Sequence, residues 1–141
     1  MSWYEFIMHE SLKEHLLMVQ AVIDRMAQCS FQLKNWAVTL AFALAAFLTG
    51  EVALTCLFVP SLPVIAFWLL DAWYLRQERL FRRLYDDVRN RQSSADFSMD
   101  VSAFKNSVPS LLAASASPTI LGFYGPLLVG IVTLAFYLPR T

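Results

Sequence analysis

A carboxylate and a group of arginines stand close together in the stretch FWLLDAWYLRQERLFRR, which begins apolar and ends strongly charged. Asp71 lies inside the apolar part, and four arginines follow within eight residues at Arg76, Arg79, Arg82 and Arg83. A carboxylate in such surroundings can gate or conduct ions, or it can pair with a cation such as Lys34, Arg76 or His15. The pattern favours pairing, because Asp71 lies only one turn inside the apolar stretch.

The four arginines also have two interpretations. Arginines that follow an apolar helix are attracted to anionic lipid headgroups. Those at 76, 79 and 83 would share one helical face, so they could instead converge on a nucleotide or an acidic partner. We favour the lipid interpretation. Nucleic-acid binding is not expected, because Glu78, Asp86 and Asp87 dilute the positive charge.

The rest of the chain offers no recognisable catalytic or metal-binding set. His9 and His15 would lie on opposite sides of a helix, so a shared metal ion is not expected. Cys29 and Cys56 form no CxxC motif,. The sequence contains no glycine-rich phosphate loop and no recognisable Ser-His-Asp set. We therefore expect no enzyme activity, no cofactor and no metal.

The elements that must position these residues are indicated by the distribution of apolar residues. The 141 residues are 57% hydrophobic, compared with about 45–50% in an ordinary soluble domain. The excess lies in two blocks, about 36–75 and 108–138. Blocks of this kind favour a membrane protein, here folded as a single domain.

The first block is long enough for a hairpin of two membrane spans. About 20 residues of helix cross the hydrocarbon core, so we predict spans over 34–50 and 54–75 with a turn near Glu51. Pro60 and Pro63 would give the second span a kink or a late start. Alternatively, the turn lies between these two prolines, which would place Glu51 inside the membrane.

Helices are also predicted on either side of this hairpin. An amphipathic helix over 10–33 either packs on neighbouring protein or lies on the bilayer surface. The second span is expected to continue as a charged cytosolic helix over 76–92, followed by a loop over 93–107. The apolar segment 108–117 is a surface helix or a re-entrant approach, and 119–138 is the third span. The predicted fold is therefore an all-α membrane protein.

The orientation follows from the basic residues, although the formal net charge is zero. Ten of the eleven Lys and Arg residues lie in segments 1–35 and 76–107. Basic residues are enriched on the cytoplasmic side of membrane spans. We therefore predict a multi-pass protein whose N-terminus is cytoplasmic and whose main partner is the lipid bilayer.

Small residues recur at every fourth position in both apolar blocks. They include Ala37, Ala41 and Ala45 in the first block and Gly122, Pro126 and Gly130 in the second. Membrane helices meet where small residues let their backbones approach. The contact is either within one chain or between copies in a homo-oligomer. In the second case, leucine at Ala41 or Gly122 should weaken association more than leucine at Ala43.

Two stretches resemble parts of a group of small, mostly uncharacterised bacterial inner-membrane proteins: LKEHLLMVQAVIDRMAQCSFQLKNWAVTL at 12–40 and FWLLDAWYLRQERLFRRLYDDV at 67–88. Members resemble the chain in an amphipathic N-terminal helix, a hairpin of spans and an aromatic-Asp-aromatic-Arg helix entering the cytosol. Some small multi-pass proteins of this kind sit beside phage-defence genes and are taken for effectors that damage the inner membrane. The resemblance covers about the first 90 residues, and the block from 108 onward departs from the simplest two-span effectors.

The small-residue stripes, the absence of a catalytic set and the long cytosolic helices together favour a small oligomeric protein of the bacterial inner membrane. Such a protein perturbs or permeabilises the bilayer when a cytosolic protein partner or signal triggers it. The alternative is a non-catalytic accessory subunit that stabilises a larger membrane complex.

Overall fold

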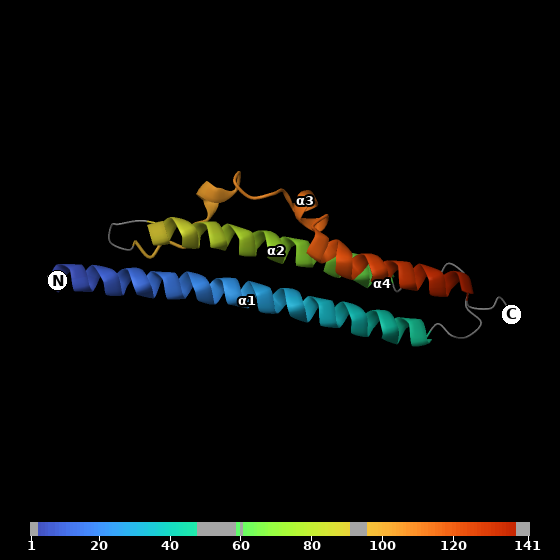
Figure 1. Cartoon of the computed structure of the whole chain (residues 1–141). Helices are drawn as coiled ribbons and strands as arrows, with labels where there is room; N and C mark the ends of the chain where they lie inside the picture. The colour runs from blue at the N-terminus through green and yellow to red at the C-terminus, as the bar shows by residue number, and fades with distance from the viewer. Residues whose placement is uncertain (1–2, 48–58, 60, 91–95, 138–141) are drawn as a thin grey trace.

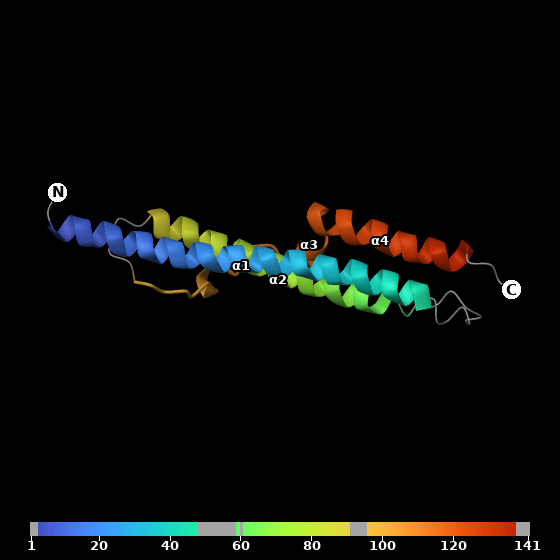
Figure 2. The same cartoon turned by 90° about the horizontal axis from the view of Figure 1, so that it is seen from below.

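The computed structural model describes residues 3–47, 59, 61–90 and 96–137, and the regular elements in these ranges are all helical. In chain order they are α1 (Trp3–Phe47), α2 (Ser61–Asn90), the short 3-10 helix η2 (Ser102–Phe104), α3 (Leu111–Ser115) and α4 (Pro118–Tyr137). The long helices α1 and α2 run antiparallel side by side, as Figures 1 and 2 both show. The all-helical class predicted from the sequence is thus confirmed over the described residues.

Helix α1 is continuous where the sequence predicted an amphipathic helix over 10–33 and a separate span over 34–50. Its 45 residues contain no glycine and no proline, so nothing in its sequence interrupts the backbone hydrogen bonding. At 1.5 Å per residue, a helix of this length extends about 68 Å. The composition of α1 changes from polar to apolar near Lys34, but the helix continues through this point without a break.

Helix α2 runs without a break from the predicted second span into the predicted charged helix over its described residues, Ser61–Asn90, in agreement with the expected continuation. It begins at Ser61, so Pro63 falls in its first turn, where a missing backbone N–H breaks no intrahelical hydrogen bond. A late start was one of the two expected effects of the prolines. Both predicted turn sites, Glu51 and the stretch beginning at Pro60, include residues outside the described ranges.

The chain then returns along the outside of the hairpin, as the upper trace in Figure 1 shows. The predicted loop 93–107 contains η2, and the predicted apolar segment 108–117 contains the five-residue helix α3. The Ser110 side chain caps α3 by accepting a hydrogen bond from the backbone N–H of Ala113,. Helix α4 begins one residue before the predicted third segment, 119–138, whose last residue lies outside the described residues.

Two hydrophobic cores lie along the hairpin. We call the first region the apolar half, which consists of 36–47, 61–75 and 111–137. Its core contains Ala37, Ala41, Val64, Ala72, Ile120 and Tyr124. We call the other region the polar half, which consists of 3–35, 76–90 and 96–110. Its core contains Val19, Ile23, Leu84 and Val88, against which Met99, Val101 and Phe104 pack.

A third element covers each half of the hairpin. In the apolar half, α4 packs on the two long helices α1 and α2. In the polar half, the return segment 96–110 packs on the same two helices. Among the described residues, no helix is both long and apolar enough to cross a membrane. The spans predicted over 34–50, 54–75 and 119–138 therefore remain predictions.

Candidate functional site

Asp71 lies fully buried where the two halves meet. Its carboxylate accepts hydrogen bonds from the Nζ of Lys34, at 2.5 Å, and from the hydroxyl of Ser30. The Nζ of Lys34 also donates to the Ser30 hydroxyl oxygen at 2.8 Å. The three side chains form a closed network in which the buried negative charge is paired and hydrogen-bonded, as burial of a charge requires.

The network depends on the antiparallel packing of the hairpin. Ser30 and Lys34 are four residues apart, so they project from the same face of α1. This face points at α2 and brings both polar groups to Asp71. Helix α4 completes the enclosure, because the Phe123 ring lies with its centroid 6.0 Å from the Lys34 Nζ, within the range of a cation–π contact.

Aromatic residues hold α4 in place next to this network. The rings of Trp68 and Tyr124 stack with centroids 6.2 Å apart and planes inclined by 4°. The Trp68 indole N–H donates to the Ser115 carbonyl at 3.0 Å, and the Tyr124 hydroxyl donates to the Phe67 carbonyl at 3.4 Å. These contacts link α2 to α3 and α4 beside the network. The level of Asp71 is therefore the place where α1, α2 and α4 are all held together.

The arrangement is suited to a latch between helices. Removing one partner of a buried ion pair leaves an uncompensated charge, which costs about 3–5 kcal/mol. Separation of α1 from α2 at this level would expose both Lys34 and Asp71 to the surroundings at once. The pair therefore favours the closed hairpin strongly in an apolar environment and more weakly where water can reach it.

The predicted arginine cluster is divided by the fold. The Nε of Arg76 donates to the backbone carbonyl of Pro109 at 3.2 Å and so ties α2 to the return segment. Arg82 pairs with Glu78 at 2.6 Å. Within the described ranges, Arg79 and Arg83 make no ion pair. Arg76 and His15, which were also predicted as partners of Asp71, thus bind elsewhere. Arg79 and Arg83 remain available to an anionic surface.

The two small-residue stripes have different environments. Ala37 and Ala41 are buried in the core between helices, so their contact is within the chain. In α4, an added Cβ at Gly122 or Gly130 would meet nothing within 4 Å. Ala41 and Ala45 of α1 and Pro126 and Gly130 of α4 line an apolar groove of about 300 Å³, together with Phe42, Leu127, Ile131 and Leu134.

Sequence reasoning missed a second buried polar contact, in the polar half. His15 is 1% exposed, and its Nε2 donates to the Ser98 carbonyl at 3.0 Å. The Phe97 ring lies over it with centroids 5.6 Å apart, and Phe97 has φ of 52°, a conformation uncommon for bulky residues,. The Nδ1 of His15 lies 3.8 Å from an Asp96 carboxylate oxygen and has no hydrogen-bond partner among the described residues.

The return segment is held in shape by short-range hydrogen bonds. Asp100 accepts from the hydroxyl of Ser102 at 2.7 Å and from its backbone N–H at 2.8 Å. These two bonds lower the pKa of the Asp100 carboxyl, because hydrogen bonds to a carboxylate favour its charged form. His15 therefore contacts a segment with its own local structure, and the contact fixes that segment to α1.

The described residues were also examined for a metal site, and the chain was compared with known proteins. In the described part of the chain, no group of three or more His, Cys, Asp and Glu side chains could hold a metal ion. Cys29 is a free, partly buried thiol, and Cys56 lies outside the described residues. Comparison of the chain with protein-family models, with curated proteins and with solved structures found no match.

Proposed function

We propose that this chain is a membrane-embedded helical protein that self-associates and alters the permeability of the bacterial inner membrane, with its polar half in the cytoplasm. The observation that carries this proposal is the apolar half, where alanines form part of the helix interface and many large apolar residues lie outside without a charged neighbour. Ala37, Ala41 and Ala72 are buried. Phe42 is 69% exposed, and Val129 is 66% exposed.

Such an exterior is unfavourable in water. The apolar half contains one charged residue, Asp71, which is buried. Large exposed apolar surfaces of soluble or membrane proteins mark contacts with a membrane or with another protein. Alanine interiors match helix packing in lipid, where van der Waals contact between close backbones replaces the hydrophobic effect as the driving force.

The apolar segments of α1, α2 and α4 enter the bilayer together as one bundle. The polar half continues from the same two helices, so it stands at the membrane surface. Arg79 and Arg83 then contact anionic lipid headgroups, worth about 1 kcal/mol per residue near the surface.

Self-association is assigned to the groove between α1 and α4. Its lining is apolar, and the glycines of α4 leave open space beside it. Helix α4 of a second copy fits this surface, because it carries no charged residue and presents Gly122, Pro126 and Gly130 at every fourth position. Close approach of such surfaces is the usual basis of helix association in membranes.

The Lys34–Asp71 pair acts as the latch of the assembly at the membrane boundary. A cytosolic protein partner or signal acting on the polar half would separate α1 from α2 and open this level of the bundle. No catalytic step, metal or cofactor is involved. As a defence effector, the protein would remain inert until it is triggered.

A membrane-potential dye tests this function in cells that express the chain together with its natural gene neighbours. We expect loss of potential and arrested growth after induction. The variant Gly130→Leu, which fills the groove from an exposed position, should reduce both effects, whereas Ala43→Leu, exposed on α1, should not. Unchanged potential and growth with the neighbours present would contradict a permeabilising role.

The open groove also favours a second candidate function, an accessory subunit of a larger membrane complex. The groove would then hold a helix of a different protein. In this case a stable partner should co-purify in fixed ratio, and Gly130→Leu should release it while the membrane potential stays unchanged.

A further inference from the structure

The buried ring of His15 has one satisfied nitrogen and one unsatisfied nitrogen. The side chain is 1% exposed, and its Nε2 donates to the Ser98 carbonyl at 3.0 Å. Its Nδ1 has no hydrogen-bond partner among the described residues, and it lies 3.8 Å from a carboxylate oxygen of Asp96. When Nε2 carries the proton of a neutral ring, Nδ1 is an acceptor, as is the carboxylate. Two acceptors therefore face each other with no proton between them.

A second proton on the ring would satisfy both groups. Both nitrogens of a charged imidazole are donors, so Nε2 would keep its bond to Ser98 while Nδ1 gained one to Asp96. A charge-assisted hydrogen bond of this kind is about twice as strong as a neutral one. The Asp96 side chain is 49% exposed, so it has room to move the short distance that the bond requires.

We propose that His15 binds this proton and thereby locks the return segment onto α1, so that the contact tightens as the pH falls. The proton comes from water, and no bond between heavy atoms changes. Histidine is the side chain whose charge ordinarily changes between about pH 5 and 8. The added stability of the closed segment is present at acidic pH and is lost as the pH rises. The proposal concerns the polar half and does not rest on membrane permeability.

The charged groups of the return segment favour the protonated ring. Besides Asp96, this segment carries Asp100, whose carboxyl pKa is lowered by local hydrogen bonds. Asp100 therefore stays negative throughout the pH range in which His15 titrates, and it cannot itself produce a response there. On α1, the neighbouring charged residues Lys13 and Glu14 are exposed. A negative charge close to a histidine favours its charged form.

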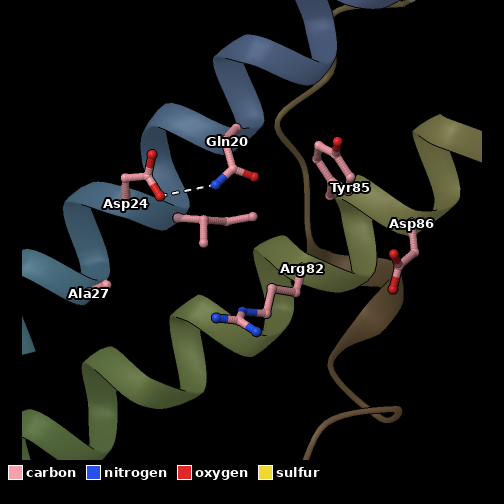
Figure 3. Close-up of a pocket in the computed structure, with 7 residues that line it drawn as sticks. Gln20, Asp24, Ala27, Arg82, Tyr85 and Asp86 are labelled. Carbon is pink, nitrogen blue, oxygen red and sulfur yellow. Dashed lines mark hydrogen bonds between the residues drawn. The ribbon is translucent and has the colours of Figure 1, made fainter.

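Helix α2 adds no buried positive charge to these surroundings. Its last turn packs in the core of the polar half through Val88 and carries Asp86, Asp87 and Arg89. Asp86 lines a separate groove of about 410 Å³ between α1 and α2, shown in Figure 3. Arg89 is exposed, whereas Asp87 is half-buried. The charge that α2 brings closest to the core is thus also negative.

The backbone of the return segment is shaped around His15. Phe97 lies between the two residues that contact the ring, and its own ring covers His15 with centroids 5.6 Å apart. Its φ of 52° is uncommon for a bulky residue,. Strain of this kind persists only where the surrounding contacts hold it. Release from His15 would let the backbone relax, which gives the segment a bound and a released state.

Hydrogen exchange of the full chain in detergent tests the proposal. Exchange is followed by mass spectrometry at about pH 8 and about pH 5.5, with exchange times scaled for the intrinsic effect of pH on amides. We expect residues 96–104 to become at least about threefold better protected at the lower pH, as for a partly exposed ion pair. Protection of α4, which is far from His15 in the fold (Figure 1), should not change.

Variants on both sides of the contact locate the proton. His15→Phe keeps a ring beneath Phe97 and cannot bind a proton, so the pH response should disappear, whereas His9→Phe should retain it. Asp96→Asn keeps an oxygen that can accept from the backbone N–H of Ser98 and removes the negative charge. It should also lose the response, whereas Asp100→Asn, in the same segment, should retain most of it.

Three results would overturn the proposal: equal protection of 96–104 at the two pH values, weaker protection at the lower pH, or a full response in Asp96→Asn. The Asp96 variant decides the outcome even if His15→Phe does not fold. Failure here would leave the membrane proposal intact, because exchange in detergent needs no permeability. Conversely, the pH response would stand even if the membrane potential proved insensitive to the protein.

Discussion

The two halves of the same hairpin are built by opposite rules. In the polar half, Val19, Ile23, Leu84 and Val88 fill the helix interface, and the exterior combines charged residues with apolar ones such as Leu17 and Phe31. In the apolar half, alanines occupy much of the interface, and residues such as Phe42 and Leu69 lie outside. Helices α1 and α2 run through both halves without a break. The difference therefore reflects two different surroundings for one pair of helices.

The contrast also extends to what covers each half. The polar half is covered by an irregular segment whose backbone groups can be satisfied by side chains and water. The apolar half is covered by the regular helix α4, which satisfies its own backbone hydrogen bonds. This is the arrangement expected when only the polar half is in contact with water. The buried Lys34–Asp71 pair marks the level at which one packing rule replaces the other.

The largest effect is expected from breaking the pair at this boundary. Lys34→Met leaves Asp71 buried and unpaired, so we expect a loss of about 3–5 kcal/mol in stability. The double variant Lys34→Met/Asp71→Leu should recover most of it. Thermal unfolding in detergent, followed by circular dichroism, gives the comparison. Lys13→Met removes an exposed lysine that pairs with Glu10 and should change stability by less than about 1 kcal/mol. Equal losses of stability in the Lys34 and Lys13 variants would contradict a special role of the buried pair at this boundary.

The next effect separates the two exteriors directly. Leu69 in the apolar half is 51% exposed, and Leu17 in the polar half is 60% exposed. If only the first faces lipid, Leu69→Lys should cost up to about 2.5–3.5 kcal/mol of insertion free energy and shift protein out of the membrane fraction. Leu17→Lys should leave the fraction unchanged. A similar fractionation of both variants would show that the two exteriors are equivalent.

A smaller effect is expected from the interior of the apolar half. Ala37 is fully buried, so Ala37→Leu should overpack the interface and cost about 1–3 kcal/mol. Ala43→Leu, at an exposed position of α1, is the control for helix propensity. Ala41 is also buried within the chain. Ala41→Leu, which was expected to weaken association between copies, should therefore first destabilise the fold of the single chain. Equal melting temperatures of the Ala37 and Ala43 variants would contradict an interior packed through alanine.

The smallest effect concerns the return segment of the polar half. His15→Phe keeps an aromatic ring beneath Phe97 and removes the hydrogen bond to the Ser98 carbonyl, so we expect a loss of about 1 kcal/mol. Limited proteolysis should then cut the chain faster between 96 and 104. His9→Phe is the control, because His9 is exposed on the same helix. Unchanged cleavage in the His15 variant would show that the contact does not hold the segment.

Local composition carried much of the information about the helices. The start of α4 follows from Pro118 and the apolar sequence after it, and it was predicted to within one residue. The continuation of α2 past its apolar part was predicted, whereas the continuity of α1 was missed, because the sequence was divided near Lys34, where its polarity changes. Polarity depends on the surroundings of a helix, whereas its length depends on breaking residues, of which Trp3–Phe47 has none.

The site was only partly accessible from the sequence. Lys34 was named as a partner for Asp71, and the spacing of Ser30 from Lys34 could have added the third member. The contact between His15 and Ser98 joins residues 83 positions apart, and no local pattern indicates it. The two grooves likewise depend on which helix faces meet, which periodicity alone does not determine.

The central claim is that the apolar half lies in lipid while the polar half lies in water. Its most direct test is cysteine labelling in intact membrane vesicles, with Cys29→Ser and Cys56→Ser as the background. A membrane-impermeant maleimide should label Leu17→Cys in inside-out vesicles and should label Leu69→Cys only after detergent is added. Equal labelling of the two positions before detergent would contradict the account.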